Sequence, residues 1–270
     1  MTIPCIVLAA AAFVAIGYLL VEYSLFAPVP RGLRILMYHK VAPANPSGLT
    51  VTTAMFDRQC AWLVARGYSA VSFAQVINNM RTGASLPERP VILTFDDGFH
   101  DFTDYTLPVL RHYNLSATVF TVPGCIGRTN AWDKTGDPLL SAEEMRTLMA
   151  TERIEFGIHA FKHDNYKYLT TAEIRGDLTK CIETMNNLGI AWTPVLAFPY
   201  GAYPRKREQN EAMRAVFREL GIAAALRIGQ RVNPLPIRDP FLFTRAKISG
   251  NDSMLDFSIK VRKGRRKLFG

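Results

Sequence analysis

The amino-acid sequence predicts an α/β fold, a distorted (β/α) barrel of about seven parallel strands, preceded by one N-terminal transmembrane helix. Short apolar runs typical of strands alternate with helical patterns from residue 33 to about residue 250, which indicates repeated β-then-α units. No dinucleotide-binding or phosphate-binding glycine motif follows any of these runs, so a closed barrel is favoured over an open nucleotide-binding sheet. The 270 residues fit one large domain.

An uncharged apolar segment begins the chain. Residues 1–21 carry no charge, and residues 3–20 are apolar apart from Pro4, Gly17 and Tyr18, which is long enough for a membrane-spanning helix. No positively charged segment precedes this run and no small-x-small cleavage site follows it, so an uncleaved anchor is favoured over a removed signal peptide. We therefore expect a membrane anchor over 1–26 and a Pro-containing hinge over 27–32.

Apolar runs and helical periodicity predict the remaining elements in order. Strands are expected at 34–38, 70–73, 91–95, 117–122, 154–158, 195–198 and 222–226. Helices are expected near 54–66, 73–81, 105–113, 141–150, 171–188 and 205–220. Capping boxes formed by Ser141 with Glu144 and by Thr170 with Glu173 mark the beginning of two of these helices. In such a barrel, functional side chains are expected at the carboxyl ends of the strands.

The strand expected at 91–95 is followed by Asp96, Asp97 and Gly98. Neighbouring residues of a regular strand point to opposite faces, so both carboxylates can reach one cavity only if the backbone leaves the strand, and Gly98 allows such a turn. One carboxylate would then be available as a metal ligand and the other as a base. A plain turn built on Asp97 and Gly98 would explain the same residues without a function.

His159 and His163 follow the strand expected at 154–158. Histidines four residues apart lie on one side of a helical turn, as two ligands of one metal ion require. Such a pair also arises by chance in a chain with five histidines, but its position after a strand, like that of Asp97, favours a shared site. Two imidazoles and one carboxylate leave coordination positions open for water and substrate, which is typical of catalytic metal sites.

The strand expected at 195–198 continues into Pro199, Tyr200 and Gly201. This segment is either a plain turn that ends the strand or an arrangement that fixes a backbone N–H and an aromatic ring at the mouth of the same cavity. On the second interpretation, Pro199 and Tyr200 bind substrate.

These three motifs, in this order, resemble the polysaccharide deacetylase family, the NodB-homology enzymes of carbohydrate esterase family four. The sequence TFDDG at 94–98 matches the first family motif, His159-x-x-x-His163 the second and FPYG at 198–201 the third. The likeness covers about residues 33–257 and points to the branch that processes poly-N-acetylglucosamine. Further segments that carry it are 36–41, 56–68, 108–118, 132–133 and 244–248.

The resemblance implies a role for each motif residue. Asp97, His159 and His163 would bind a divalent metal ion, by default zinc, with cobalt, nickel, manganese or iron as alternatives. The ion would lower the pKa of a bound water and polarise the acetamide carbonyl, while Asp96 would accept the proton of that water as general base. The backbone N–H of Tyr200 would help to stabilise the oxyanion.

Two features depart from the commoner family pattern. Ala197 stands where an arginine is usual in the third motif, and the late L-x-H histidine is missing, because His163 is the last histidine of the chain. His39, at the end of the first strand, is a candidate general acid, and Arg245, at the end of a late strand, is a candidate partner that keeps Asp96 ionised. Purely structural roles for His39 and Arg245 stay open.

Positive charge is concentrated near the C-terminus. The formal net charge is +9, and residues 260–267 alone contribute Lys260, Arg262, Lys263, Arg265, Arg266 and Lys267. A basic tail over 258–270 would be attracted to an anionic membrane or an acidic polymer, and it does not require nucleic acid as a partner. A solvated tail without a partner explains it equally well.

We therefore expect a deacetylase domain over 33–257 that removes N-acetyl groups from an amino-sugar polysaccharide. The basic residues after the apolar segment would keep this domain cytoplasmic by the positive-inside rule, but long domains translocate largely regardless of charge. We expect a single-pass protein of a bacterial-type cytoplasmic membrane with its catalytic domain outside the cytoplasm. The alternatives are O-acetyl or N-formyl hydrolysis on a surface or lipid-linked glycan, a carbohydrate-binding pseudoenzyme, and an iron-dependent oxygenase.

Overall fold

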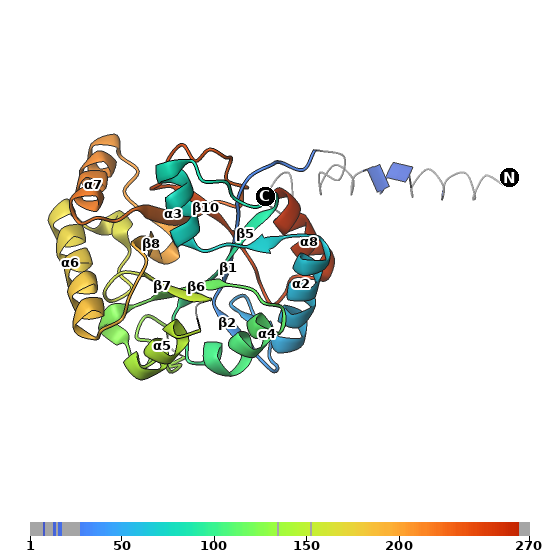
Figure 1. Ribbon diagram of the computed structural model, residues 1–270, viewed down its shortest axis with the longest axis horizontal. Helices are drawn as coiled ribbons and strands as arrows, with labels where there is room; N and C mark the ends of the chain where they lie inside the picture. The colour runs from blue at the N-terminus through green and yellow to red at the C-terminus, as the bar shows by residue number, and fades with distance from the viewer. Residues whose placement is uncertain are drawn as a thin grey trace.

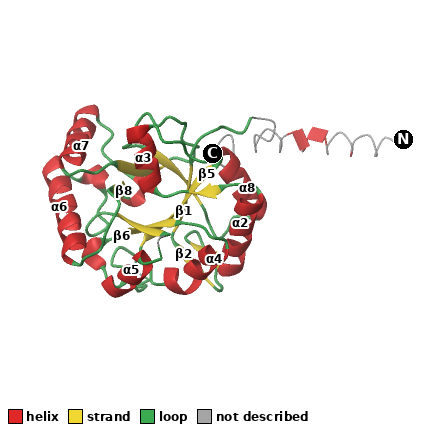
Figure 2. Ribbon diagram, in the orientation of Figure 1, coloured by secondary structure: helices red, strands yellow, loops and turns green. Residues whose placement is uncertain are grey.

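Seven parallel strands close into the predicted barrel (Figure 1, Figure 2). The computed structural model describes residues 28–133, 135–151 and 153–264, together with 8, 13–14 and 16–17. The strands pair in the order β1-β10-β9-β8-β7-β6-β5, and β5 pairs again with β1. Their bounds are β1 (Arg34–Tyr38), β5 (Pro90–Asp97), β6 (Ala117–Thr121), β7 (Ile154–Ile158), β8 (Val195–Ala197), β9 (Ala224–Ile228) and β10 (Phe243–Lys247).

Helices surround this barrel, with α6 and α7 on one side and α2 and α8 on the opposite side (Figure 1). Both predicted capping boxes are present, at the beginning of α5 and of α6. The helices are α2 (Thr53–Ala65), α3 (Phe73–Thr82), α4 (Leu107–His112), α5 (Ala142–Met149), α6 (Thr171–Asn187), α7 (Arg207–Glu219) and α8 (Met254–Lys263). Short 3-10 or π turns are η1 (Phe102–Thr106), η2 (Pro123–Cys125), η3 (Tyr166–Tyr168) and η4 (Pro199–Gly201).

Alternation along the strands divides the barrel interior from the helix-covered exterior. Ile35 pairs with Ile92 and Phe243 with Leu226, and these four residues belong to one buried cluster that fills the interior. Phe120 lies in the same cluster, and the space for its ring exists because Gly157 faces it: a Cβ added at Gly157 would lie 2.5 Å from the ring. The interior is therefore a packed core and not a channel.

Helix α3 covers the end of the barrel opposite the strands' carboxyl ends. Its residues Phe73 and Val76 join the interior cluster. The Glu155 carboxylate, on β7, accepts hydrogen bonds from the backbone N–H groups of Phe73 and Ala74, at 2.5 and 3.3 Å. A carboxylate at a helix N-terminus satisfies amide groups that have no partner within the helix. Helix α3 thus closes one end of the barrel interior, so a substrate cavity can open only at the other end.

Several predicted elements differ from the observed ones. The strand expected at 70–73 is reduced to β4 (Ser69–Ala70), outside the closed ring, because the capping box of Ser72 begins α3 at once. The strand β10 takes the seventh place instead, and β9 lies two residues later than expected. A small parallel pair, β2 (Lys40–Ala42) with β3 (Thr50–Thr52), was not predicted.

Both ends of the chain carried predictions, and the structure describes the C-terminal end more fully than the N-terminal end. The tail expected over 258–270 is helical as far as Lys263, because the buried Ile259 and Val261 dock α8 onto the barrel. The anchor expected over 1–26 lies almost entirely outside the described residues. Within the described residues, no helix combines the length and apolar character that a bilayer crossing needs.

Candidate metal centre and catalytic pocket

A cavity of about 250 Å³ opens at the carboxyl ends of the barrel strands. Of the eight residues predicted for the site, seven line it: His39, Asp96, Asp97, His159, His163, Tyr200 and Arg245. The eighth, Pro199, is buried and is not among the lining residues. The residues come from β5, β10 and the segments that follow β1, β7 and β8. Strand ends far apart in the sequence therefore meet in one site, as the barrel topology predicts.

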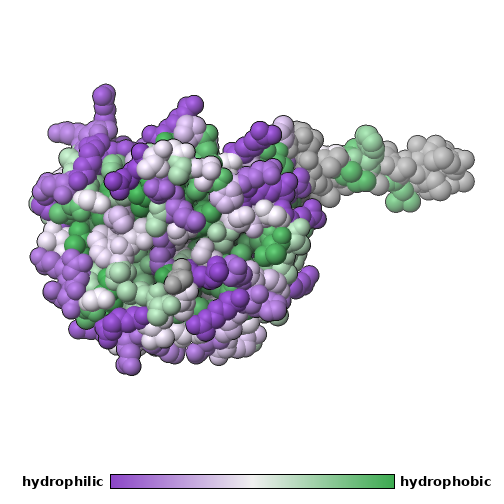
Figure 3. Space-filling model, viewed as in Figure 1, coloured by the Kyte–Doolittle hydropathy of each residue, from purple (hydrophilic) through white to green (hydrophobic). Residues whose placement is uncertain are grey.

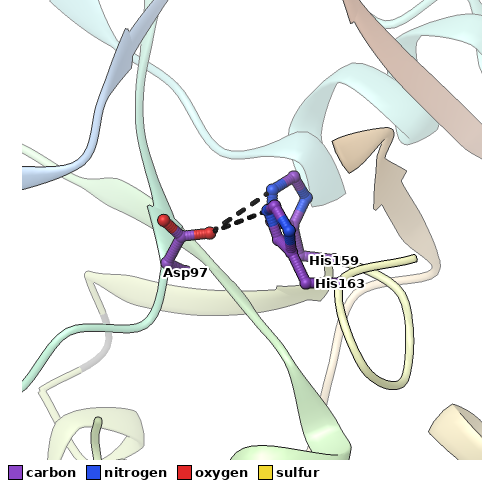
Figure 4. Close-up of side chains that lie close together, drawn as sticks. All are labelled: Asp97, His159 and His163. Atoms are coloured by element: carbon purple, nitrogen blue, oxygen red, sulfur yellow. Dashed lines mark ion pairs between the residues drawn. The ribbon is translucent and has the colours of Figure 1, made fainter. Parts of the chain in front are cut away.

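Asp97, His159 and His163 form a compact, buried group (Figure 4). One oxygen of Asp97, Oδ1, lies 3.6 Å from His159 Nε2 and 3.4 Å from His163 Nε2. All three candidate ligand atoms lie within 4.8 Å of one another. Ligand atoms of one ion, each about 2 Å from it, are separated by such distances. The three residues are thus close enough to share one metal ion.

The hydrogen bonds around the group leave these ligand atoms available. His159 Nδ1 lies 2.7 Å from the carbonyl oxygen of Ala197, which can only accept, so Nδ1 carries the proton and Nε2 presents its lone pair to the site. His163 Nδ1 lies 3.2 Å from the hydroxyl of Tyr200, which also turns Nε2 toward Asp97. Asp97 Oδ1 is buried without a hydrogen-bond partner among the described residues. This donor set fits a divalent cation.

The backbone turns sharply at Asp97. Such a turn is needed because the neighbouring carboxylates of Asp96 and Asp97 can face one cavity only if the chain departs from regular strand geometry. Asp97 and Gly98 each have φ 75°, in the left-handed region that residues other than glycine rarely adopt. The prediction that the chain leaves the strand here is confirmed, although the turn begins at Asp97 itself. Backbone strain of this kind is retained where the surrounding structure fixes it, often at functional sites.

The segment that carries the two histidines is a loop, and the helical turn expected for it is wrong. Ala160 and His163 have φ 61° and φ 63°, which no α-helix accommodates. Asp177 of α6 fixes the loop, because its carboxylate accepts hydrogen bonds from the Phe161 N–H (3.0 Å) and the Tyr166 hydroxyl (2.5 Å). The histidines converge through this irregular backbone and not through helical spacing.

Asp96 is paired with Arg245 inside the barrel mouth. The guanidinium of Arg245 donates from Nη1 to Oδ1 at 2.5 Å and from Nη2 to Oδ2 at 2.8 Å, so the contact expected from the sequence is present and bidentate. Burial on its own would raise the pKa of the Asp96 carboxyl, but the positive charge of Arg245, with the neighbouring histidines, lowers it to about 2. Asp96 is therefore ionised at neutral pH.

His39 and Lys247 both line the cavity. The Nδ1 atom of His39 is buried and has no hydrogen-bond partner among the described residues. Burial lowers the pKa of His39, and Asp96 and Asp97 only partly oppose this shift. The resting imidazole is therefore mainly neutral near pH 7, and any proton that it donates to a leaving group must first be taken up during the reaction.

Two aromatic rings border the candidate metal site, and one of them was not predicted. The Trp132 ring stacks on His163 with centroids 4.6 Å apart, and the Tyr200 ring meets the same imidazole edge-on at 4.7 Å. Tyr200 is 58% exposed, so it stands at the open mouth. Lys247 also lines the cavity, and the two-residue spacing from Arg245 on one strand could have predicted it. Trp132 lies in a loop with no comparable periodicity.

The sequence profile described as polysaccharide deacetylase matches residues 83–225, just over half of the chain. This range contains Asp96, Asp97, His159 and His163, whereas His39 and Arg245 lie outside it. The central part of the candidate site is thus within the family match.

Named relatives and solved structures are similar to this chain. The poly-beta-1,6-N-acetyl-D-glucosamine N-deacetylase of Escherichia coli K12 is 28% identical over 217 residues, covering 66% of this chain and 32% of that protein. The Staphylococcus epidermidis protein of the same name is 27% identical over 188 residues, covering 62% of this chain and 64% of that protein. The chain thus spans less than two thirds of the length of either relative.

Solved structures share the fold. IcaB from Ammonifex degensii superposes with a TM-score of 0.71 at 18% identity, covering 87% of this chain and 98% of that one. The Streptococcus pyogenes deacetylase PplD, in complex with acetate, gives 0.69 at 20% identity and covers 88% of this chain and 100% of that one. With the profile match across its central half, the chain belongs to the polysaccharide deacetylase family.

Proposed function

We propose that this protein is a metal-dependent hydrolase that removes N-acetyl groups from an amino-sugar polysaccharide of the poly-N-acetylglucosamine type. The observation that carries the proposal is the buried group of Asp97, His159 and His163, whose ligand atoms face one another beside the ionised Asp96. The products would be acetate and a free amine on the sugar. The names of the relatives favour this substrate class.

Each group of residues in the cavity would have a separate role in the reaction. A divalent cation held by Asp97, His159 and His163, zinc by default, supplies Lewis acidity that makes water more nucleophilic and the acetamide carbonyl more electrophilic. Asp96 receives the proton of the attacking water, and Arg245 holds its two oxygens in a fixed orientation. His39, on another side of the cavity, is the candidate to deliver a proton to the departing amine.

The mouth of the cavity suits a sugar ring. Trp132 and Tyr200 both contact His163 and would present apolar ring surfaces beside the acetamide, and sugar rings commonly pack on aromatic faces. The volume of about 250 Å³ holds roughly one acetylated sugar, so a polymer would lie across the mouth with one acetamide inserted.

For the cellular site, we propose anchoring in a bacterial-type cytoplasmic membrane by the apolar segment over 1–26, with the catalytic domain outside the cytoplasm. The proposal is supported by the uncharged sequence of residues 1–21. A cell-surface polysaccharide would be accessible from that position.

The test is acetate release from poly-N-acetylglucosamine oligomers, with and without a chelator. We expect release that the chelator abolishes and zinc, cobalt or nickel restores. Asp96→Asn should lose the activity while zinc binding, measured by calorimetry, persists. A folded, zinc-loaded protein that releases no acetate from any glycan would contradict the proposal and favour a binding role. Faster release of acetate from O-acetylated glycans, or of formate from N-formylated glycans, would redirect the substrate assignment.

A further inference from the structure

A second cavity, of about 600 Å³, lies near the amino ends of β1 and β5, away from the candidate metal centre. It is bordered by the segment at 29–31, the C-terminal end of α2, the loop before β5 and the last turn of α8. What its walls share is positive charge and aromatic surface. We call it the arginine cavity, and the residues that define it are Arg31, Arg34, Trp62, Arg66, Tyr68, Glu88, Arg89 and Arg262.

The arginine cavity carries an excess of positive charge. Five guanidinium groups line it against a single carboxylate, that of Glu88. Across the described ranges, none of the five arginines forms an ion pair with a carboxylate. Burial lowers the pKa of Arg34, Tyr68 opposes this shift, and the positive charge of Arg89 adds to it. Gathering like charges without a counterion is unfavourable, and a bound anion would relieve this repulsion.

Aromatic and backbone contacts hold three of these five guanidinium groups in place. Trp62 and Tyr68 stack with centroids 5.9 Å apart, and the guanidinium groups of Arg66 and Arg34 lie over their rings at 5.6 and 5.7 Å. Arg34, only 6% exposed, donates to the carbonyl oxygens of Gly32, Pro30 and Val261. Arg89 donates to the carbonyl oxygen of Arg66 at 2.8 Å. Three of the cations of the cavity, those of Arg34, Arg66 and Arg89, are therefore preorganised.

We propose that the arginine cavity binds a phosphate group, of the kind carried by an anionic phospholipid headgroup or by free phosphate. A phosphate offers several acceptor oxygens and up to two negative charges, so it can engage more than one guanidinium at a time, which a single carboxylate cannot do as well. Residues 29–31 border the cavity, and in the sequence they belong to the hinge expected over 27–32, after the apolar segment. Figure 3 shows that strongly hydrophilic residues, drawn in purple, cover much of the visible surface of the domain.

The experiment measures the thermal midpoint of the full chain in neutral detergent micelles at constant ionic strength. One arm adds inorganic phosphate, and the other dopes the micelles with phosphatidylglycerol or with monoacylglycerol, which lacks phosphate. A ligand that binds only the folded protein raises the midpoint in proportion to ln(1 + [L]/Kd). We expect the phosphate-bearing probe to raise it, and Arg66→Gln with Arg89→Gln to weaken the fitted Kd by about tenfold or more.

Control variants distinguish phosphate binding in the arginine cavity from a general attraction of phosphate to a basic protein. Arg146→Gln with Arg153→Gln removes the same charge and the same type of hydrogen bond, since both donate to backbone carbonyls elsewhere on the protein, and it should leave the Kd unchanged. If the first variant does not fold, Arg31→Gln with Arg262→Gln tests the same cavity at two exposed positions. This proposal does not depend on the deacetylase activity.

The two arms identify the source of the phosphate. A response to phosphatidylglycerol alone assigns a lipid headgroup, a response to inorganic phosphate alone assigns free phosphate, and a response to both supports the shared chemistry. No response to either probe overturns the proposal. An equal loss of affinity in the control variant also overturns it.

Discussion

At the scale of single residues, the pair of Asp96 and Arg245 decides the electrostatics of the barrel mouth. Both side chains are nearly fully buried, and the charge of each is balanced mainly by the other. Removing one partner of such a pair leaves an uncompensated charge, which costs about 3–5 kcal/mol. The bidentate geometry also fixes the direction of the Asp96 oxygens.

We predict that Arg245→Gln lowers kcat/KM by about a hundredfold or more, because Asp96 loses both its orientation and the charge that depresses its pKa. The acidic limb of the pH–rate profile should move to higher pH, since the Asp96 carboxyl then takes up a proton more readily. Arg214→Gln is the control, because Arg214 forms a similar bidentate pair with Asp239 away from the cavity. An unshifted pH profile in Arg245→Gln would show that Arg245 is only structural.

The metal-free protein should lose stability as the pH falls from 6.5 toward 4. Burial lowers the pKa of His159 to about 4 from an ordinary value of 6.5, although Asp96 opposes this shift. Between these values the unfolded chain binds a proton that the folded protein does not, so acid favours unfolding. At pH 5, the lowered pKa of His159 reduces the free energy of unfolding by about 2 kcal/mol.

Thermal unfolding in the presence of a chelator at pH 7.5 and pH 5 measures this loss. The fall in midpoint should be smaller in His159→Asn and unchanged in His112→Asn, because His112 is exposed. An identical fall in all three proteins would assign the acid sensitivity to other groups.

At the scale of elements, strands with continuous apolar runs were predictable and loops were not. The strands β1 and β7 have the predicted bounds because every residue of β1 and all but Glu155 of β7 are buried, so each sequence is mainly apolar and has one charged residue, Arg34 or Glu155. The strand β10 was expected only as a late strand without bounds, because Arg245 and Lys247 interrupt its apolar pattern. Both charged side chains line the cavity. The rule that a buried strand has a continuous apolar sequence therefore fails where function requires polar residues.

The candidate site was predictable only in part for a related reason. The donor residues were recognisable from their types and their positions after strands. The left-handed backbone at Ala160 and His163 and the closure of the Trp132 loop over the site depend on contacts between distant segments. No local pattern in the sequence encodes such contacts.

The loop that carries the histidines should depend on Asp177 of α6. Asp177→Ala removes the acceptor of the Phe161 N–H and of the Tyr166 hydroxyl, so His163 loses its fixed position. We expect zinc affinity to fall by about 10–100-fold, the usual effect of removing support behind a metal ligand. Glu173→Ala is the control on the same helix, because it weakens only the N-terminal capping box. Calorimetric zinc titration distinguishes the two, and equal affinities would exclude the positioning role.

At the scale of the whole molecule, the two ends of the barrel have different tasks. The end closed by α3 is held by Glu155, and the open end assembles the candidate metal centre from strands that are not neighbours. Asp97 is the last residue of β5, while His159 and His163 follow β7, with β6 between the two strands. The ligand set therefore exists only when β5, β6 and β7 are assembled in the sheet, so we expect metal binding to be linked to folding.

Zinc should consequently raise the thermal midpoint of the entire domain. At a free zinc concentration of 100 times the dissociation constant, binding to the folded state alone adds about 2.7 kcal/mol. For a domain of this size the midpoint should rise by about 5–10 °C, and calorimetry should show one transition shifted as a unit. Asp97→Asn should largely abolish the rise because the amide replaces the charged ligand, whereas Asp104→Asn, at an exposed carboxylate outside the site, should preserve it. A rise of equal size in Asp97→Asn would mean that zinc binds elsewhere, and the assignment of the metal centre would fail.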